Sequence, residues 1–164
     1  MKHKAFLFLQ SYLILSLLFE MHSCKTTKVN AQGAKGDVIL SLERTPCFGR
    51  CPVYVMKIYE DGLLLYQGKR NVADTGCHYR KISKQELASL KQAFSNVGFF
   101  EMADSYPESE RAPVDLPSCI IFFKSGNQEK TITDHHWKTP EKLALLERKI
   151  DSLTTSKFSQ FCDN

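Results

Sequence analysis

Short runs of alternating residues dominate the chain after its first 37 positions. In most of them every second residue is apolar, which is the period of a half-buried β-strand. Four runs predict strands, at residues 38–43, 53–60, 63–67 and 77–82. Asp61-Gly62 separates the second run from the third, and an Asp-Gly pair in this position is a strong β-hairpin signal. A two-residue turn there would place Ile58 opposite Leu65.

Two other segments repeat apolar residues at the three- and four-residue spacing of an α-helix. The first segment starts with Ser83 and Glu86, the two ends of a capping box, and stops at Gly98. The second starts with Thr139 as its predicted cap and Pro140 at its first helical position, where the missing amide costs nothing. The side chains predicted to be buried are Leu87, Leu90, Phe94, Val97, Leu143, Leu146, Ile150 and Leu153.

Two further strands are predicted between the helices. Residues 118–124 are rich in Ile and Phe, a polar turn follows, and residues 128–133 return as a partner strand. The order ββββαββα predicts an α+β domain, in which two amphipathic helices pack on one face of an antiparallel sheet. We place this single domain at residues 37–154 and a C-terminal tail at residues 155–164.

The first residues have the pattern of an export signal. Basic residues at positions 2–4 precede an apolar run at positions 5–19. This run is shorter than the about 20 apolar residues that a bilayer span needs. We therefore interpret residues 1–23 as a signal peptide.

Ser23-Cys24 resembles the end of a bacterial lipobox, so we expect a lipid on Cys24 that holds the protein to a membrane. The alternatives are ordinary cleavage and an uncleaved anchor. Residues 24–36 are polar and form the lipidated N-terminus and a flexible tether. Lys25 follows the cysteine, and by resemblance to lipoprotein sorting this favours the outer membrane, with the domain facing the periplasm.

Two prolines, a glycine and two cysteines crowd the segment between the first two predicted strands. Cys47 and Cys51 have three residues between them, including Gly49, which permits a tight turn. Since an exported protein matures in an oxidising compartment, we predict a Cys47–Cys51 disulfide. Its contribution to the free energy of unfolding is small, about 2 kcal/mol, because the loop that it closes is short.

The other cysteines leave alternatives open. If Cys24 is acylated, five cysteines remain, so at least one of them is free or pairs between molecules. A Cys77–Cys119 bridge is a candidate because both residues lie in predicted strands. Cys162, in the tail, is the candidate free thiol.

The segment Pro46-Cys47-Phe48-Gly49-Arg50-Cys51-Pro52-Val53-Tyr54 resembles the signature of a bacterial domain-of-unknown-function family, number 6438. The similarity extends over residues 38–153, and includes Asp61-Gly62, Ile82-Ser83, Asp115-Leu116-Pro117 and Pro140-Glu141-Lys142-Leu143. The resemblance implies a small domain, often in a secreted or lipid-anchored protein. It implies no reaction.

Residues that could carry chemistry are present, but their spacing matches no known motif. Seven residues could bind a metal: Cys47, Cys51, Cys77, His78, Cys119, His135 and His136. They show neither the two-residue cysteine spacing nor the helical histidine pairs of zinc sites, so we predict no metal. Catalytic signatures for serine hydrolases, metalloproteases, glycosidases and phosphate-binding loops are also missing. A candidate polar surface site would combine Arg44, Tyr54, Asp115, Asp134, His135 and His136.

These observations favour a lipid-anchored periplasmic binding or scaffold module with an unknown protein or envelope partner. We expect no enzymatic activity and no cofactor. The net charge of +4 over 164 residues is too small to suggest nucleic-acid binding. The alternative is a metal-binding or enzymatic protein of the cell envelope that uses its Cys, His and Asp residues.

Overall fold

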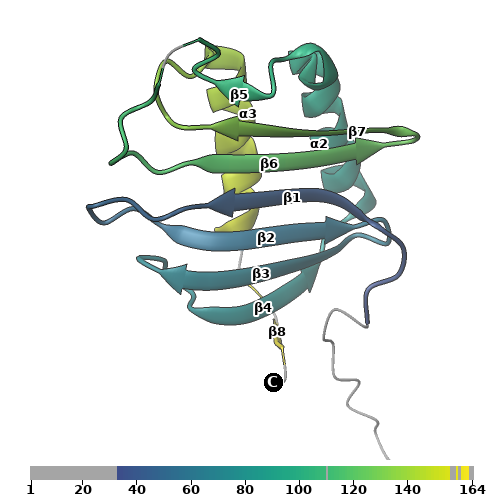
Figure 1. The fold of residues 1–164 in the computed structure, drawn as a ribbon. Coiled ribbons are helices and arrows are strands. Elements are labelled where there is room, and N and C mark those ends of the chain that lie inside the picture. Colours follow the sequence, from purple (N-terminus) through teal and green to yellow (C-terminus); the bar gives the residue numbers. More distant parts are fainter. Residues whose placement is uncertain (1–32, 110, 156–157, 159, 163–164) are drawn as a thin grey trace, which may run out of the picture.

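The computed structural model describes residues 33–109, 111–155, 158 and 160–162. Eight strands form one sheet, in the spatial order β5-β7-β6-β1-β2-β3-β4-β8 (Figure 1). Their bounds are β1 Val38–Arg44, β2 Val53–Tyr59, β3 Leu63–Arg70, β4 Gly76–Lys81, β5 Ser105–Tyr106, β6 Cys119–Ser125, β7 Gln128–Asp134 and β8 Gln160–Phe161. Neighbouring strands are antiparallel, apart from the parallel pair β5 and β7.

Two α-helices complete the fold: α2 at Lys84–Val97 and α3 at Glu141–Asp151. The predicted start of α2 is confirmed, because the Glu86 amide donates to the Ser83 hydroxyl and the Ser83 amide donates to the Glu86 carboxylate. The predicted stop is confirmed as well, since Gly98 adopts the left-handed conformation at φ 66°. Short 3-10 helices follow both α-helices, at Phe99–Glu101 and Ser152–Thr154.

The start of α3 differs from the prediction. Pro140 is the N-cap, and no side-chain hydrogen bond caps the helix. The Thr139 hydroxyl instead donates to the Asp134 carboxylate, at 2.7 Å from Oδ2 and 3.0 Å from Oδ1. A buried carboxylate needs hydrogen-bond donors more than an exposed helix end does, because water can solvate the helix end.

The α+β class, the mostly antiparallel sheet and the two helices are confirmed. The predicted element order is incomplete, because it omits β5 between α2 and β6 and β8 after α3. Each of these strands has only two residues, too few to display a repeating pattern in the sequence. β8 pairs with β4, so the chain after residue 154 continues the sheet.

The predicted hairpin register is wrong by one residue. Ile58 lies opposite Leu64 instead of Leu65. The turn between β2 and β3 contains Glu60 as well as Asp61 and Gly62, and Gly62 takes a positive φ of 80°. Three-residue hairpin loops with a left-handed glycine are a common alternative to the two-residue turn that we assumed.

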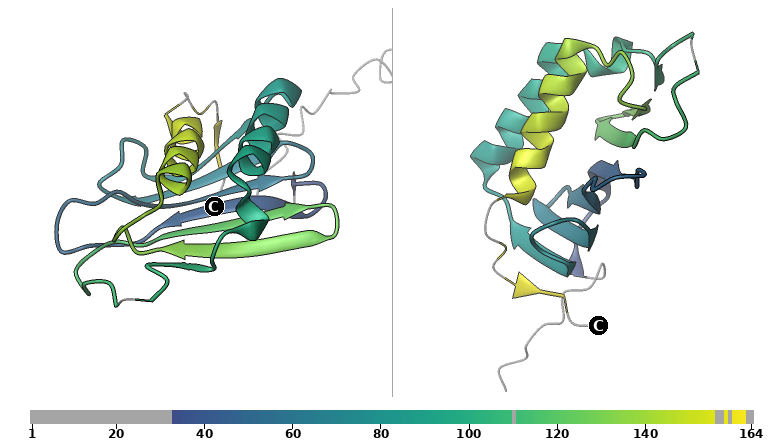
Figure 2. Two further views of the ribbon diagram at one scale, coloured as in Figure 1. Left: turned by 90° about the horizontal axis from the view of Figure 1, so that it is seen from above. Right: turned by 90° about the vertical axis from the view of Figure 1, so that its left-hand side faces the viewer.

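The core combines apolar side chains of the sheet and of the two helices, which run side by side in Figure 2. The largest fully buried side chains from the strands are Leu40, Leu42, Met56, Ile58, Leu64, Ile121 and Ile132. Of the helix side chains that we predicted to be buried, five are confirmed: Leu90, Phe94, Leu143, Leu146 and Ile150. The other three, Leu87, Val97 and Leu153, are partly buried. Phe94 of α2 stacks on Phe123 of β6, with ring centroids 3.9 Å apart.

Two disulfides are formed. Cys47 and Cys51 are joined across the turn between β1 and β2, with Cα atoms 5.8 Å apart. Cys77 is joined to Cys162, so our assignment of Cys162 as the free thiol is wrong, and the free cysteine is the buried Cys119. A Cys77–Cys119 bridge is ruled out by the sheet order, because β1, β2 and β3 lie between β6 and β4.

Within the described part of the chain, no helix has the length and apolar character needed to cross a membrane. The predicted signal peptide at 1–23, the lipid-bearing Cys24 and most of the tether at 24–36 lie outside the described residues. They stay predictions.

Candidate functional site

Four polar residues form a row across one end of the sheet. In the strand register Tyr54 pairs with Arg44, Arg44 with Cys119, and Cys119 with Asp134, so the row crosses β2, β1, β6 and β7. All four are buried, and their strands begin or end there, on the left in Figure 1. α3 adds Glu147 and Asp151 above the row, and the turn after β7 adds His136. We call these seven residues the polar cluster.

Arg44 is at the centre of the polar cluster. Its Nη1 donates to Glu147 Oε2 at 2.9 Å, and its Nη2 donates to Asp151 Oδ2 at 2.6 Å. A second bond to Asp151, from Nε to Oδ1 at 3.3 Å, makes that pair bidentate. Tyr54 also donates its hydroxyl to Asp151. Arg44 therefore connects the end of β1 to two successive turns of α3.

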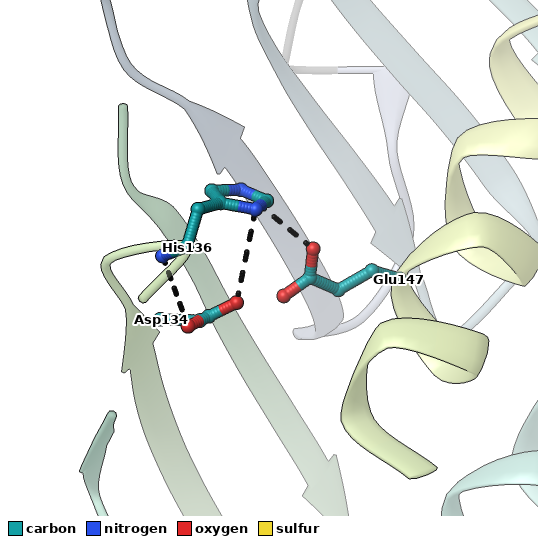
Figure 3. Close-up of side chains that lie close together, drawn as sticks. All are labelled: Asp134, His136 and Glu147. Atoms are coloured by element: carbon teal, nitrogen blue, oxygen red, sulfur yellow. Dashed lines mark hydrogen bonds and ion pairs between the residues drawn. The ribbon is translucent and has the colours of Figure 1, made fainter. Parts of the chain in front are cut away.

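Asp134 is fully buried and is held by its own turn. It accepts the two bonds from the Thr139 hydroxyl and one from the backbone amide of His136, at 3.0 Å. His136 adopts a positive φ of 52°, and its ring lies over Asp134. Figure 3 shows the imidazole facing both the Asp134 carboxylate and Glu147, which extends from α3.

The protonation of Glu147 and His136 follows from their burial. Loss of water raises the pKa of Glu147, the charge of Arg44 opposes the rise, and Asp134 adds to it, so that the pKa is about 7. Burial and then the charge of Arg44 lower the pKa of His136. The neutral ring accepts a hydrogen bond from Arg44 Nη1 at its Nε2, over 2.7 Å. Burial also raises the pKa values of Tyr54 and Cys119, so neither ionises near neutral pH.

Asp134, His136 and Glu147 present three potential metal ligands, whose donor atoms lie within 4.8 Å of one another. Arg44 Nη1, however, lies 2.7 Å from His136 Nε2 and 2.9 Å from Glu147 Oε2. The guanidinium is thus hydrogen-bonded to two of the three potential metal ligands, and it already supplies the positive charge that a metal would bring. A divalent cation would have to displace it, so the arrangement fits an arginine-centred ion-pair network better than a metal site.

A pocket of about 400 Å³ opens beside the polar cluster, and we call it the cluster pocket. Tyr54 and Asp151 belong to both, and the facing wall is the loop after β3, which includes Val72 and Asp74. Gly68 permits this loop to fold back, because a Cβ there would collide with the Asp74 carbonyl. The Tyr54 and Tyr66 rings, with centroids 5.3 Å apart, form an aromatic floor.

Of the six residues in the predicted polar surface site, four come together: Arg44, Tyr54, Asp134 and His136. They are mostly buried, so they form an internal network and not a surface. His135 points elsewhere and pairs with Ser118, at 2.8 Å between Nδ1 and Oγ. Asp115 is exposed in the loop before β6.

Sequence reasoning missed Glu147 and Asp151. A signal for Glu147 exists, since it lies four residues after Leu143 and three before Ile150. Leu143 and Ile150 belong to the buried stripe of α3. A glutamate between them on the same stripe therefore predicts a buried carboxylate that needs a cation.

Comparison with known proteins yields one family. The family model described as "Domain of unknown function (DUF6438)" matches residues 38–154, which span both helices and seven of the strands. No curated protein matches the chain.

Proposed function

The chain belongs to the DUF6438 family of domains of unknown function, and from its site we propose that it is a lipid-anchored binding module of the cell envelope. In this proposal Cys24 carries the lipid and the protein is located at the outer membrane, facing the periplasm. It binds a partner and catalyses no reaction. The observation that carries the proposal is the cluster pocket beside a polar network whose charged groups are already paired with one another.

The chemistry of the polar cluster favours binding over catalysis. Arg44, Glu147 and Asp151 are engaged with one another, and the neutral Tyr54 donates to Asp151. Tyr54 supplies the one hydroxyl among these four residues, and it lies next to the Asp151 carboxylate, but burial raises the pKa of Tyr54 and keeps it protonated, so it is not activated as a nucleophile. The network instead gives a rigid support for the wall of the pocket. Such support is what a preformed binding site requires.

The direction of β1 indicates how the cluster pocket is oriented relative to the proposed membrane tether. β1 begins at Val38, next to the proposed tether, and ends at Arg44 in the polar cluster. Seven residues of strand span about 20 Å, so the cluster pocket lies at the end of the sheet remote from the tether. We take α2 and α3 to cover the same face of the sheet, as Figure 2 draws them. A membrane-tethered domain would then present the pocket away from the lipid.

The lining of the cluster pocket indicates the ligand class. Its charged side chains are the carboxylates Asp74 and Asp151, of which Asp151 is already paired with Arg44, so Asp74 supplies the uncompensated negative charge; the other walls are mainly apolar or aromatic. A group with an apolar body and a positively charged or N–H-rich end complements such a pocket. A lysine-like side chain or an alkylammonium group has this chemistry.

We expect hexylammonium to bind the purified mature protein and to shift the backbone amide resonances of Val72 and Ala73 in a saturable way. Asp74→Asn should weaken this binding about twofold to fivefold, because one exposed charge contributes little. Asp115→Asn removes an equally exposed carboxylate outside the pocket and should leave the affinity unchanged. Equal affinities for all three proteins, or no saturable shift, would remove the cluster pocket from the proposal.

The proposed lipid anchor at Cys24 can be tested independently of the cluster pocket. Cells that express the wild-type protein should incorporate radiolabelled palmitate into it, and cells that express Cys24→Ala should not. The labelled protein should fractionate with the outer membrane. Equal labelling of both proteins would refute lipidation at Cys24, whatever the outcome at the cluster pocket.

The alternative function, a metal-binding or enzymatic envelope protein, would use Asp134, His136 and Glu147. Arg44 argues against it for the reason given above. Elemental analysis that finds a stoichiometric metal in the purified wild type would favour this alternative.

A further inference from the structure

A second pocket, of about 400 Å³, lies at the same end of the sheet as the cluster pocket. One wall is the loop between β5 and β6, and the other is formed by Ser118, just before β6, and His135, just after β7. We call it the loop pocket. The polar cluster does not use either of these two residues.

Backbone hydrogen bonds hold Ser118 and His135 in place. The Ser118 amide donates to Thr45 Oγ1 at 2.7 Å, and the Ser118 carbonyl accepts from the Thr45 amide at 3.0 Å. The His135 amide donates to the Tyr106 carbonyl at 3.0 Å. Two other segments of the chain, at Thr45 and at Tyr106, thus fix this pair, whose side chains are joined by the 2.8 Å hydrogen bond between Ser118 Oγ and His135 Nδ1.

The Ser118–His135 pair offers a hydrogen-bond donor in either tautomer of the ring. If Nδ1 accepts from Ser118, the proton is on Nε2, and that N–H has no other bond to the described residues. If Nδ1 carries the proton and donates, the Ser118 hydroxyl is free to donate instead. The pair is therefore suited to a ligand that accepts hydrogen bonds.

The charge of the loop pocket also favours a ligand that accepts hydrogen bonds. Among the residues that the structure describes, Arg111 is its one lining side chain with a fixed charge, and no carboxylate lines it. The polarity is thus opposite to that of the cluster pocket. The Ser118–His135 pair has no carboxylate partner in the described chain that would orient the ring for nucleophilic catalysis, so binding is the chemistry that these residues support.

We propose that the loop pocket, through Arg111, Ser118 and His135, binds an oxyanion, either a carboxylate or a phosphate. Arginine and a histidine–hydroxyl pair supply the charge and the donors that such a group needs. Apart from Ser105, the remaining lining, which includes Pro107 and Leu116, is apolar and would contact the body that carries the anion.

The test is a titration of the ¹⁵N-labelled mature protein with sodium acetate and, separately, with sodium phosphate. Sodium chloride at equal ionic strength is the reference, and the amide resonances of Ser118 and His135 are the readout. We expect a saturable shift with at least one anion, and the anion that binds more tightly identifies the class. Arg111→Gln should weaken that binding about threefold to tenfold. Ser118→Ala should also weaken it.

Arg50→Gln is the matched control, because Arg50 is equally exposed in the turn between β1 and β2 but does not line the loop pocket. Its affinity for the anion should equal that of the wild type, and unchanged spectra away from the pocket would show that each variant is folded. The proposal is overturned if neither anion gives a saturable shift beyond chloride, or if Arg50→Gln and Arg111→Gln weaken binding equally. Neither result bears on hexylammonium binding.

Discussion

Replacing Arg44 with methionine should lower the free energy of unfolding by about 3–5 kcal/mol, the range for removing one partner of a buried ion pair. Methionine fills much of the same volume, so the loss comes from charge and not from a cavity. Glu147 is almost completely buried and would be left without its cation, and Asp151 would lose its bidentate partner. Urea denaturation of the purified mature protein measures the effect.

The loss on Arg44→Met should depend on pH. The folded-state pKa of Glu147, about 7, lies above its ordinary value of 4.5, so the folded protein holds a proton that the unfolded chain releases between these values. The contribution of Glu147 to stability is therefore lost as the pH rises through about 7. Arg44 lowers this pKa, so without Arg44 the ionised form costs more. The variant should lose more stability at pH 8 than at pH 5.

His136 adds to this difference with the same sign. Arg44 helps to lower the pKa of His136, so at low pH the wild type pays to keep a neutral ring that the unfolded chain would protonate. The Arg44→Met variant is relieved of that cost. A double variant, Arg44→Met with Glu147→Gln, should be more stable than the single variant Arg44→Met. Its loss of stability relative to the wild type should also differ much less between pH 5 and pH 8. An equal loss at pH 5 and pH 8 for the single variant would contradict our account of Glu147.

Leu146→Ala should lower the free energy of unfolding by about 2–5 kcal/mol, the range for truncating a buried leucine. Leu146 is only 2% exposed and contributes to the core under α3. The neighbouring Leu145 is 52% exposed, so Leu145→Ala makes the same chemical change at a solvent-exposed position of the same helix. It should cost far less, because little apolar surface is removed from the core and helix propensity changes only slightly.

Chemical denaturation of both leucine variants gives the comparison directly. Leu90→Ala in α2 should resemble Leu146→Ala, since Leu90 is 3% exposed. Similar losses for Leu145→Ala and Leu146→Ala would mean that the buried face of α3 is assigned wrongly.

Several elements could be predicted from the sequence because neighbouring residues determine them. The capping box of α2 needs only Ser83 and Glu86, three positions apart, and the stop needs only Gly98. The Cys47–Cys51 bridge spans one turn. The hairpin at Asp61-Gly62 was predicted for the same reason, but its register was not, because a three-residue turn and a two-residue turn share that dipeptide.

The polar cluster shows what the amino-acid sequence left undetermined. Arg44 and Tyr54 are close in sequence, but Cys119 and Asp134 become their neighbours only because β6 and β7 add to the β1 edge in one particular register. The pairing of Cys77 with Cys162 likewise requires β8 to extend the far edge of the sheet.

Local signals thus determined the class of the fold, most of its elements and the faces of its helices, because each depends on side chains within a few residues of one another. Tertiary structure decided which polar groups share a site. Arg44 meets Glu147 and Asp151 across separations of 103 and 107 residues. No local pattern encodes such a contact, since strand order, register and the position of α3 must all be in place before the charges are buried together.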